Sequence, residues 1–435
     1  MGSKENKKNI IVLGFALFAM FFGAGNLIFP PYLGLTTGEK WFSGFLCFMV
    51  VDAGLAVLAL LAVFRSGNKP SDLFNKLGKP SAMLLTAIIT LCIGPLVSIP
   101  RTAATTFELA VQPLLPDCSS WVSAAVFFLV VGLLCIHPTK IVDIVGKILS
   151  PLMLVALAIM IFKGIFSPIK IVDIGVTTQT ALKDGLAAGY QTMDMMGAVL
   201  FSTVVLTDIT AKGYSRGHRL QAVGLSGCVA ALGLFAVYGG LTFLGASAAG
   251  TISPDLGQSG VLLALINSLL GENGIFLLGI IVAAACLTTA IGLVSASAES
   301  FCALSGGKLS YRPLVIVICV ISFVISNAGL SAIIALAAPV LELIYPVLVS
   351  VVILSFLPSP LCGKEICRGA ALASFFTAVY EMADRLSGIG LGSEFLPFAS
   401  VGLGWLLPAA FGAVLGGIWS RRVKQKRKQS CRAAC

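Results

Sequence analysis

Long apolar segments dominate this chain of 435 residues and decide what it can fold into. Hydrophobic residues make up 57% of the sequence and charged residues only 11%, a proportion that a soluble domain of this size could not bury in one core. A helix needs roughly 20 mostly apolar residues to cross about 30 Å of hydrocarbon. Segments of this kind predict an all-α polytopic membrane protein of about twelve spans. They cover residues 10–35, 41–64, 82–112, 121–136, 141–163, 182–209, 219–246, 273–303, 312–327, 331–357, 368–385 and 394–418.

No polar domain interrupts these spans, so we expect one transmembrane domain over residues 1–435 that ends in a basic tail at residues 419–435. Residues 259–271 are apolar but too short to cross, which predicts a helix lying at the outer face. The first span lacks the small-residue pattern of a cleavage site, so we expect it to remain in the mature chain.

Positive charge is unevenly distributed between the predicted loops. Most of the 29 Lys and Arg residues fall on one side of the membrane, including those of the tail. Cytoplasmic loops carry such an excess, so both termini are predicted to lie inside the cell. The net charge of +10 is therefore attributed to membrane topology, with the lipid bilayer as partner. A basic flank of the last span is favoured over a nucleic-acid patch.

Two spans carry residues that interrupt a membrane helix. In the first span Gly23, Gly25 and Asn26 precede a Pro pair, and in the sixth span Asp194 lies between two glycines, Gly189 and Gly197. Each repeat unit would hold five spans, so the first and sixth spans enter from opposite sides, as inverted repeats require. This pattern predicts repeats at residues 10–163 and 182–357, with extra helices at 368–418. The alternative is that the glycines only permit close helix packing.

The stretch GAGNLIFPP at residues 23–31 resembles the bacterial branched-chain amino acid carrier family of cation-coupled symporters. GPLVSIPRTAATTFE at residues 94–108 and YQTMD at residues 190–194 are similar to that family's patterns, and the resemblance extends over essentially the whole chain. It implies a fold like that of the leucine transporter LeuT. It also implies sodium-coupled import of leucine, isoleucine and valine across a bacterial inner membrane, and a protein that is not an enzyme.

The resemblance also implies a sodium site. ACLTTA at residues 285–290 is similar to the LeuT-type segment that binds sodium together with carbonyls before the first break. The expected ligands are the Thr288 and Thr289 hydroxyls and the carbonyls of Ala19, Phe22 and Ala285. The alternative for the two threonines is hydroxyl bonding to carbonyls of their own helix.

A zwitterionic amino acid needs donors for its carboxylate, acceptors for its ammonium group and an apolar pocket for its side chain. Free N–H groups at the second half of the first span would face the carboxylate, and carbonyls ending its first half would face the ammonium group. Residues flanking the second break would contact the side chain, although such Met residues can instead fill a core. The candidates are Phe21, Gly23, Gly25, Asn26, Leu27, Thr192, Met193, Asp194 and Met196.

Charged residues within the spans raise functional questions because their insertion is costly. Asp194 could hold the broken helix, pair with Arg101 or accept a proton. Arg101 is expected to pair with an acid, and Glu342 is a gate or proton candidate; these two are the coupling or gating candidates. Asp52 more plausibly satisfies a neighbouring helix than binds solute.

The pattern favours a carrier over other classes. An intramembrane enzyme would need a nucleophile with a base, or a metal cluster, and no such set is apparent. A pore would show a filter motif. No cofactor is expected beyond Na⁺, with H⁺ as the alternative coupling ion, and another neutral amino acid remains an alternative solute.

Overall fold

The structure is a computed structural model that describes residues 3–67, 69–136, 154–155, 157–166, 172–358, 363–387, 390 and 392–433. These residues form helices, turns and loops without a strand, so the all-α prediction is confirmed for them. Within these described residues, six helical stretches are long and apolar enough to span a membrane. They are Ala24–Ser66, Lys79–Val111, Thr178–Ala211, Gly217–Ser247, Pro254–Leu304 and Leu330–Ser355. Ala24–Ser66 holds part of the first predicted span and all of the second, and the number twelve stays a prediction.

The first half of the chain contains the predicted spans one to four. Helices α1 (Ser3–Phe21) and α2 (Ala24–Thr37) form the first span, and α3 (Trp41–Met49), a π-helical turn η2 (Val50–Gly54) and α4 (Leu55–Ser66) form the second. After α5 (Pro70–Phe74), the third span consists of α6 (Lys79–Leu91), η4 (Cys92–Leu96), α7 (Ser98–Thr106) and η5 (Phe107–Val111). Helix α8 (Ser120–Ile136) follows. Most of the predicted fifth span, 141–163, lies outside the described residues. Leu157–Phe166, which overlaps its end, is helical.

The second half begins with α10 (Thr178–Thr192) and α11 (Asp194–Ala211), followed by α12 (Arg216–Ser247). Helix α13 (Gly257–Leu304) bends sharply at Gly271, whose φ of 66° interrupts it. The piece before the bend is the short helix that the sequence predicts at residues 259–271. Helices α14 (Tyr311–Ser326), α15 (Leu330–Ser355) and α16 (Lys364–Ser387) complete this half.

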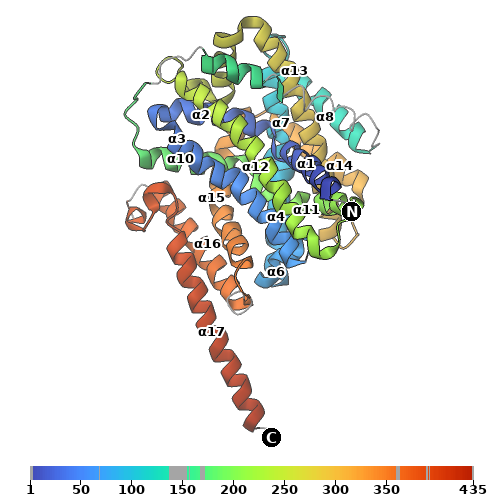
Figure 1. The fold of residues 1–435 in the computed structure, drawn as a ribbon, viewed down its shortest axis with the longest axis vertical. Helices are drawn as coiled ribbons and strands as arrows, with labels where there is room; N and C mark the ends of the chain where they lie inside the picture. Colours follow the sequence, from blue (N-terminus) through green and yellow to red (C-terminus); the bar gives the residue numbers. More distant parts are fainter. Residues whose placement is uncertain are drawn as a thin grey trace.

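The last predicted span is wrong at its start. Helix α17 begins at Leu406, not near residue 394, and continues to Ala433 through the basic segment. Residues 393–401 instead form two 3₁₀ turns, η8 (Ser393–Phe395) and η9 (Ala399–Val401). Left-handed backbone at Gly392, Phe398 and Gly402 prevents a continuous helix there. Figure 1 shows α17 projecting beyond the other helices.

Contacts between the helices define two groups, which meet where α2 packs against α13. Helices α1 and α2 lie along α12, while α10 lies along α3 and α11 along α4. The other group includes α7 and η5 against α13, and α14 against α8. Glycine permits the closest contact: a Cβ added to Gly34 of α2 would lie 1.9 Å from the Thr242 carbonyl oxygen of α12.

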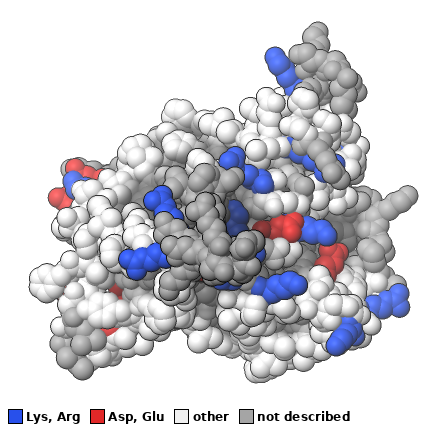
Figure 2. All heavy atoms as spheres, turned by 90° about the horizontal axis from the view of Figure 1, so that it is seen from below, with Lys and Arg blue, Asp and Glu red and all other residues white. Residues whose placement is uncertain are grey.

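The lower end of the molecule is basic. Figure 2 shows this face, where Lys and Arg side chains outnumber Asp and Glu. Such an excess is the distribution that the loop charges predict for a cytoplasmic side.

Candidate functional site

The first predicted break lies between Phe21, where α1 ends, and Ala24, where α2 begins. Gly23 precedes α2 with no side-chain cap, and the first turn of α2 holds no acidic residue. The first N–H groups of a helix have no partner within it, and the aligned peptide dipoles place partial positive charge there. The start of α2 is therefore a set of N–H donors with no side-chain acceptor.

The second break lies at Met193, between α10 and α11. Met193 has a φ of 63°, the left-handed region that a non-glycine residue rarely adopts. The expectation that glycines make this break is wrong. Gly189 and Gly197 are both helical, and an added Cβ at Gly189 would lie 2.7 Å from the Val51 side chain, so Gly189 permits close packing.

A hydrogen bond joins the two breaks. The Asn26 amide Nδ2 donates to Asp194 Oδ2 at 2.7 Å and to the Tyr238 hydroxyl oxygen at 2.5 Å. Asn26 and Tyr238 are 2% and 0% exposed. Asp194 begins α11, where its carboxylate is stabilised by the positive end of the helix dipole. The sequence did not single out Tyr238, because one Tyr in an apolar helix gives no signal of such a contact.

Arg101 of α7 binds the backbone carbonyls next to the second break. Its Nη1 donates to the Gln191 carbonyl oxygen at 2.5 Å, and its Nη2 lies 3.4 Å from that of Thr192. These carbonyls end α10, where a helix lacks internal donors and carries partial negative charge. The guanidinium also lies over the Phe29 ring, 5.6 Å from its centroid.

The expectation that Arg101 pairs with an acid is wrong. Within the described part of the chain no carboxylate lies within 4.0 Å of its guanidinium, and carbonyls accept its hydrogen bonds instead. Glu342 forms an ion pair with Arg385 of α16. Both line a different cavity of about 770 Å³, between α10, α15 and α16. Glu342 is therefore separate from the two breaks.

A cavity of about 540 Å³ lies where the two breaks face α7 and α13. Most of the predicted site residues line it: Ala19, Phe21, Gly23, Gly25, Asn26, Arg101, Thr192, Met193, Asp194, Thr288 and Thr289. Five do not: Phe22, Leu27, Met196, Ala285 and Glu342, which lines the cavity between α10, α15 and α16. Met196 is 0% exposed and fills the core, the alternative that the sequence left open. Phe201, Ser98 and Thr102 also line the cavity.

Three of the predicted sodium ligands, Ala19, Thr288 and Thr289, line the central cavity beside the first break. The Thr288 hydroxyl donates to the carbonyls of Ala284 and Ala285 at 3.2 and 3.0 Å, as membrane threonines usually do. A hydroxyl that donates its proton keeps its lone pairs. Thr289 Oγ1 lies 3.9 Å from where a Cβ would stand on Gly23, so Thr289 faces the break. Whether these uncharged oxygens hold a monovalent cation stays a prediction.

Asp52 is a buried acidic residue that lies beside the second break. It lies in the π-helical turn η2 and is 0% exposed. Thr192 and Asp194 are polar groups that it faces. Neither oxygen of its carboxylate has a hydrogen-bond partner in the described part of the chain. Asp52 does not line the central cavity and faces groups of α10 and α11, so the expectation that it satisfies a neighbouring helix and does not bind solute stays a prediction.

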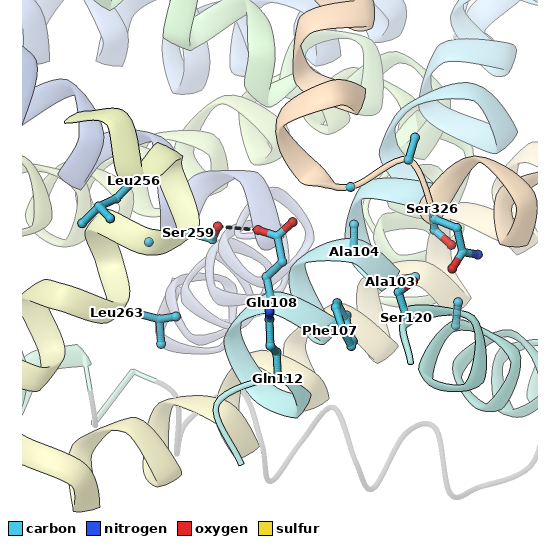
Figure 3. A pocket seen from close by; sticks show the side chains of 15 residues that line it. Ala103, Ala104, Phe107, Glu108, Gln112, Ser120, Leu256, Ser259, Leu263 and Ser326 are labelled. Atoms are coloured by element: carbon cyan, nitrogen blue, oxygen red, sulfur yellow. Dashed lines mark hydrogen bonds between the residues drawn. The ribbon is translucent and has the colours of Figure 1, made fainter. Parts of the chain in front are cut away.

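The central cavity is lined by Asp208 and Glu299 near the ends of α11 and α13. At the opposite end of α13, Glu108 of η5 accepts a hydrogen bond from the Ser259 hydroxyl and one of 3.0 Å from the backbone N–H of Leu330, which begins α15. Figure 3 shows Glu108 and Ser259 pointing toward each other across a second cavity, of about 480 Å³. One carboxylate thus ties three elements together at this end.

The chain is similar to known transport proteins over nearly its whole length. The profile of a family described as branched-chain amino acid transport protein matches residues 6–423. The Bacillus subtilis branched-chain amino acid permease BraB is 34% identical over 426 residues, covering 94% of this chain and 95% of the permease. The Escherichia coli branched-chain amino acid permease BrnQ is 34% identical over 432 residues, covering 97% of this chain and 98% of the permease.

Solved structures show the same fold at low sequence identity. The inward-facing conformation of Mhp1 is similar with a TM-score of 0.62 and 14% identity, covering 95% of this chain and 91% of Mhp1. A Na⁺-coupled sialic acid symporter in an outward-open state has a TM-score of 0.56 and 14% identity, with coverage of 94% and 90%. The expected LeuT-like transporter fold is thereby supported.

Proposed function

The chain belongs to the branched-chain amino acid transport protein family, and from that premise we propose that it imports leucine, isoleucine and valine together with sodium. Its relatives are transport proteins and not enzymes. The observation that carries the proposal is the pair of helix breaks that line one cavity, with the α2 amides free of any side-chain cap. We place the protein in a bacterial inner membrane with both termini in the cytoplasm.

The solute's charged groups match the two ends of the first break. The amides of Gly25, Asn26 and Leu27 at the start of α2 would bind the carboxylate, because the helix dipole and free N–H groups favour an anion there. The carbonyls that end α1 at residues 21–23 would bind the ammonium group. The chain's own donors and acceptors thus orient the zwitterion.

The branched side chain would lie against Met193 and Phe201, which line the same cavity. A Met side chain adapts to several branched shapes, which suits a carrier of three related solutes. The aromatic ring adds apolar area on the other side. Met196 does not take part in this contact, because it is buried in the core and does not line the cavity.

Sodium would be held by the hydroxyls of Thr288 and Thr289 and by carbonyls of Ala19, Phe22 and Ala285. Oxygen ligands suit a hard cation, and the carbonyl end of α1 adds partial negative charge. Bound sodium would stabilise α1 against α13, so that the solute site beside it is formed only when the ion is present.

The residues at the cavity's ends support an inward-facing state. Asp208 and Glu299 lie near the ends of α11 and α13 that the charge distribution assigns to the cytoplasm. The contacts of Glu108 close the other end. Alternating access would move the group of α1, α2, α10, α11 and α12 against α7 and α13.

Uptake of labelled leucine into proteoliposomes under an imposed sodium gradient tests the proposal. We expect accumulation to depend on sodium in the parent protein, to lose that dependence in Thr289→Ala, and to keep it in the matched control Thr289→Ser. Counterflow of labelled leucine, measured without any ion gradient, separates a carrier from a channel. Unchanged sodium dependence in Thr289→Ala would remove this ion site, and absence of counterflow would refute the carrier.

A further inference from the structure

Two carboxylates face each other in the membrane interior beside the second break. Asp194 is 9% exposed and lines the central cavity, whereas Asp52 is 0% exposed and lies behind it, facing Asp194 and Thr192. Two buried carboxylates at close range cannot both be ionised without a large electrostatic cost. A pair of this kind titrates as one unit, and one proton shared between the two carboxylates removes most of that cost.

The pair is short of hydrogen-bond donors. Among the described residues, neither oxygen of Asp52 has a hydrogen-bond partner, and neither does the hydroxyl of Tyr345, which is also 0% exposed and near the two carboxylates. The Asn26 amide donates to Asp194 Oδ2 and to the oxygen of Tyr238. The Tyr238 hydroxyl proton is then free for another acceptor. A proton on the pair would supply the missing donor for an Asp52 oxygen.

The surrounding charges do not neutralise the pair. The titratable and charged groups that face it are Tyr238 of α12, Tyr345 of α15 and Arg101 of α7. Only Arg101 is a cation, and its nearest acceptors are the carbonyls that end α10. With both carboxylates ionised, this buried group would carry one net negative charge. A single proton makes it neutral.

The solute site and the pair are connected through one residue. Asn26 contributes its backbone N–H to the uncapped start of α2 and its side chain to Asp194. A solute carboxylate at the start of α2 would therefore lie close to the Asp194 carboxylate. Like charges in a medium of low dielectric repel strongly, and protonation of the pair removes the repulsion.

We propose that Asp52 and Asp194 form a proton site, and that the pair takes up one proton when the solute's carboxylate binds at the start of α2. The inference rests on the proposed function and deepens it, because a proton then accompanies the amino acid in addition to sodium. No bond other than the O–H bond to a carboxylate oxygen is made. The proton comes from water in the cavity, which Asp194 lines, and returns to water when the solute leaves.

The dissociation constant of leucine, measured on the detergent-solubilised protein across pH at constant sodium, tests the proposal. By linkage, uptake of one proton raises Kd about tenfold for each pH unit above the range in which the free pair titrates. In Asp52→Asn the pair is gone, and we expect Kd to change less than about twofold over the same range. Asp117→Asn removes a carboxylate from an exposed loop and should behave like the parent protein.

Proton uptake, followed with a pH indicator in weak buffer as leucine is added, gives a second readout. We expect alkalinisation by the parent protein and by Asp117→Asn, and none by Asp52→Asn. Leucine binding by the parent protein with a flat pH profile and no proton uptake would overturn the inference and leave the proposed function standing. Absence of leucine binding at every pH would refute the proposed function itself. Should Asp52→Asn fail to fold, the indicator measurement on the parent protein decides.

Discussion

The amide of Asn26 donates a hydrogen bond of 2.7 Å to Asp194 and so joins the two helix breaks, although 168 residues separate them in the chain. Each residue begins or lies in the first turn of a half-helix, α2 or α11. The two half-helices therefore start from one shared contact. Movement of either one changes the position of the other, which is what a site formed by two repeats requires.

Asn26→Ala removes this contact and leaves buried acceptors without their donor. An unsatisfied buried polar group costs about 1–3 kcal/mol, and more when it is charged. We therefore expect leucine to bind at least about tenfold more weakly, as measured by its dissociation constant. Asn75→Ala, at an exposed position, is the matched control and should bind leucine as the parent protein does. Equal affinity in both variants would show that the link is dispensable.

Met193 and Phe398 are the non-glycine residues with positive φ in the described part of the chain, and they make a matched pair. A side chain in this region costs roughly 1–2 kcal/mol, which glycine relieves. Met193 is 1% exposed, and truncating a buried Met costs about 2–5 kcal/mol, which exceeds the relief. Phe398 is 53% exposed and loses much less packing.

We therefore expect Met193→Gly to lower the free energy of unfolding by about 1–3 kcal/mol, whereas Phe398→Gly stays within about 1 kcal/mol of the parent protein. Thermal unfolding in detergent, followed by circular dichroism, measures both. A stabilised Met193→Gly would mean that the left-handed backbone, and not the side chain, dominates at the second break.

The sequence predicts the first break well and the second one imperfectly, for a physical reason. The first break lies at Gly23, within the glycine-rich stretch that the sequence singles out, although Gly25 belongs to the first turn of α2. At the second break the left-handed residue is Met193, held by packing between distant segments, and a Met in a sequence gives no sign of that.

Charged residues show the same limit. The cost of burying Arg101 predicts a partner, and an acid is the natural choice. The observed acceptors are carbonyls that exist only because α10 ends at Thr192. Because a chain does not mark where a helix will leave its carbonyls unpaired, this partner could not be read from the sequence. The start of α17 was missed in the same way, since the apolar residues before it suit a helix.

Gly25→Ala tests whether the guanidinium must lie against the first break. An added Cβ would stand 2.8 Å from Arg101 Nη2 and 3.0 Å from Cζ. The guanidinium is buried, bonded to Gln191 and packed on Phe29, so it cannot move without losing those contacts. We expect leucine counterflow to fall at least about tenfold, which corresponds to roughly 1.4 kcal/mol.

Gly217→Ala is the control for this substitution, because nothing lies within 4 Å of its added Cβ. Alanine is favoured over glycine in a helix by about 1 kcal/mol, so Gly217→Ala should be neutral or slightly stabilising. If both alanine variants transport equally, Arg101 can leave the break without consequence.

Glu108→Gln tests whether Glu108 keeps the protein closed at the end opposite Asp208 and Glu299 of the central cavity. The two carboxylate oxygens of Glu108 accept hydrogen bonds from Ser259 and Leu330. The substitution removes one of these acceptors and the negative charge at the start of α15. Hydrogen bonds to a charged group contribute about 1.5–3 kcal/mol, so the closed state should lose about tenfold in population relative to the open one. A cysteine in place of Ala104, which lines the cavity of Figure 3, should then react severalfold faster with a membrane-impermeant thiol reagent.

Glu272→Gln, at an exposed position of α13, is the matched control and should leave the reaction rate unchanged. Labelling of the protein without the added cysteine gives the background from Cys118, which lies in the loop before α8. The expected increase follows from the position of Glu108, whose carboxylate alone bonds both the short helix before Gly271 and the first residue of α15. Equal rates in Glu108→Gln and Glu272→Gln would therefore mean that packing between α2 and that short helix, through Leu35, Val261 and Leu265, keeps this end closed without the carboxylate.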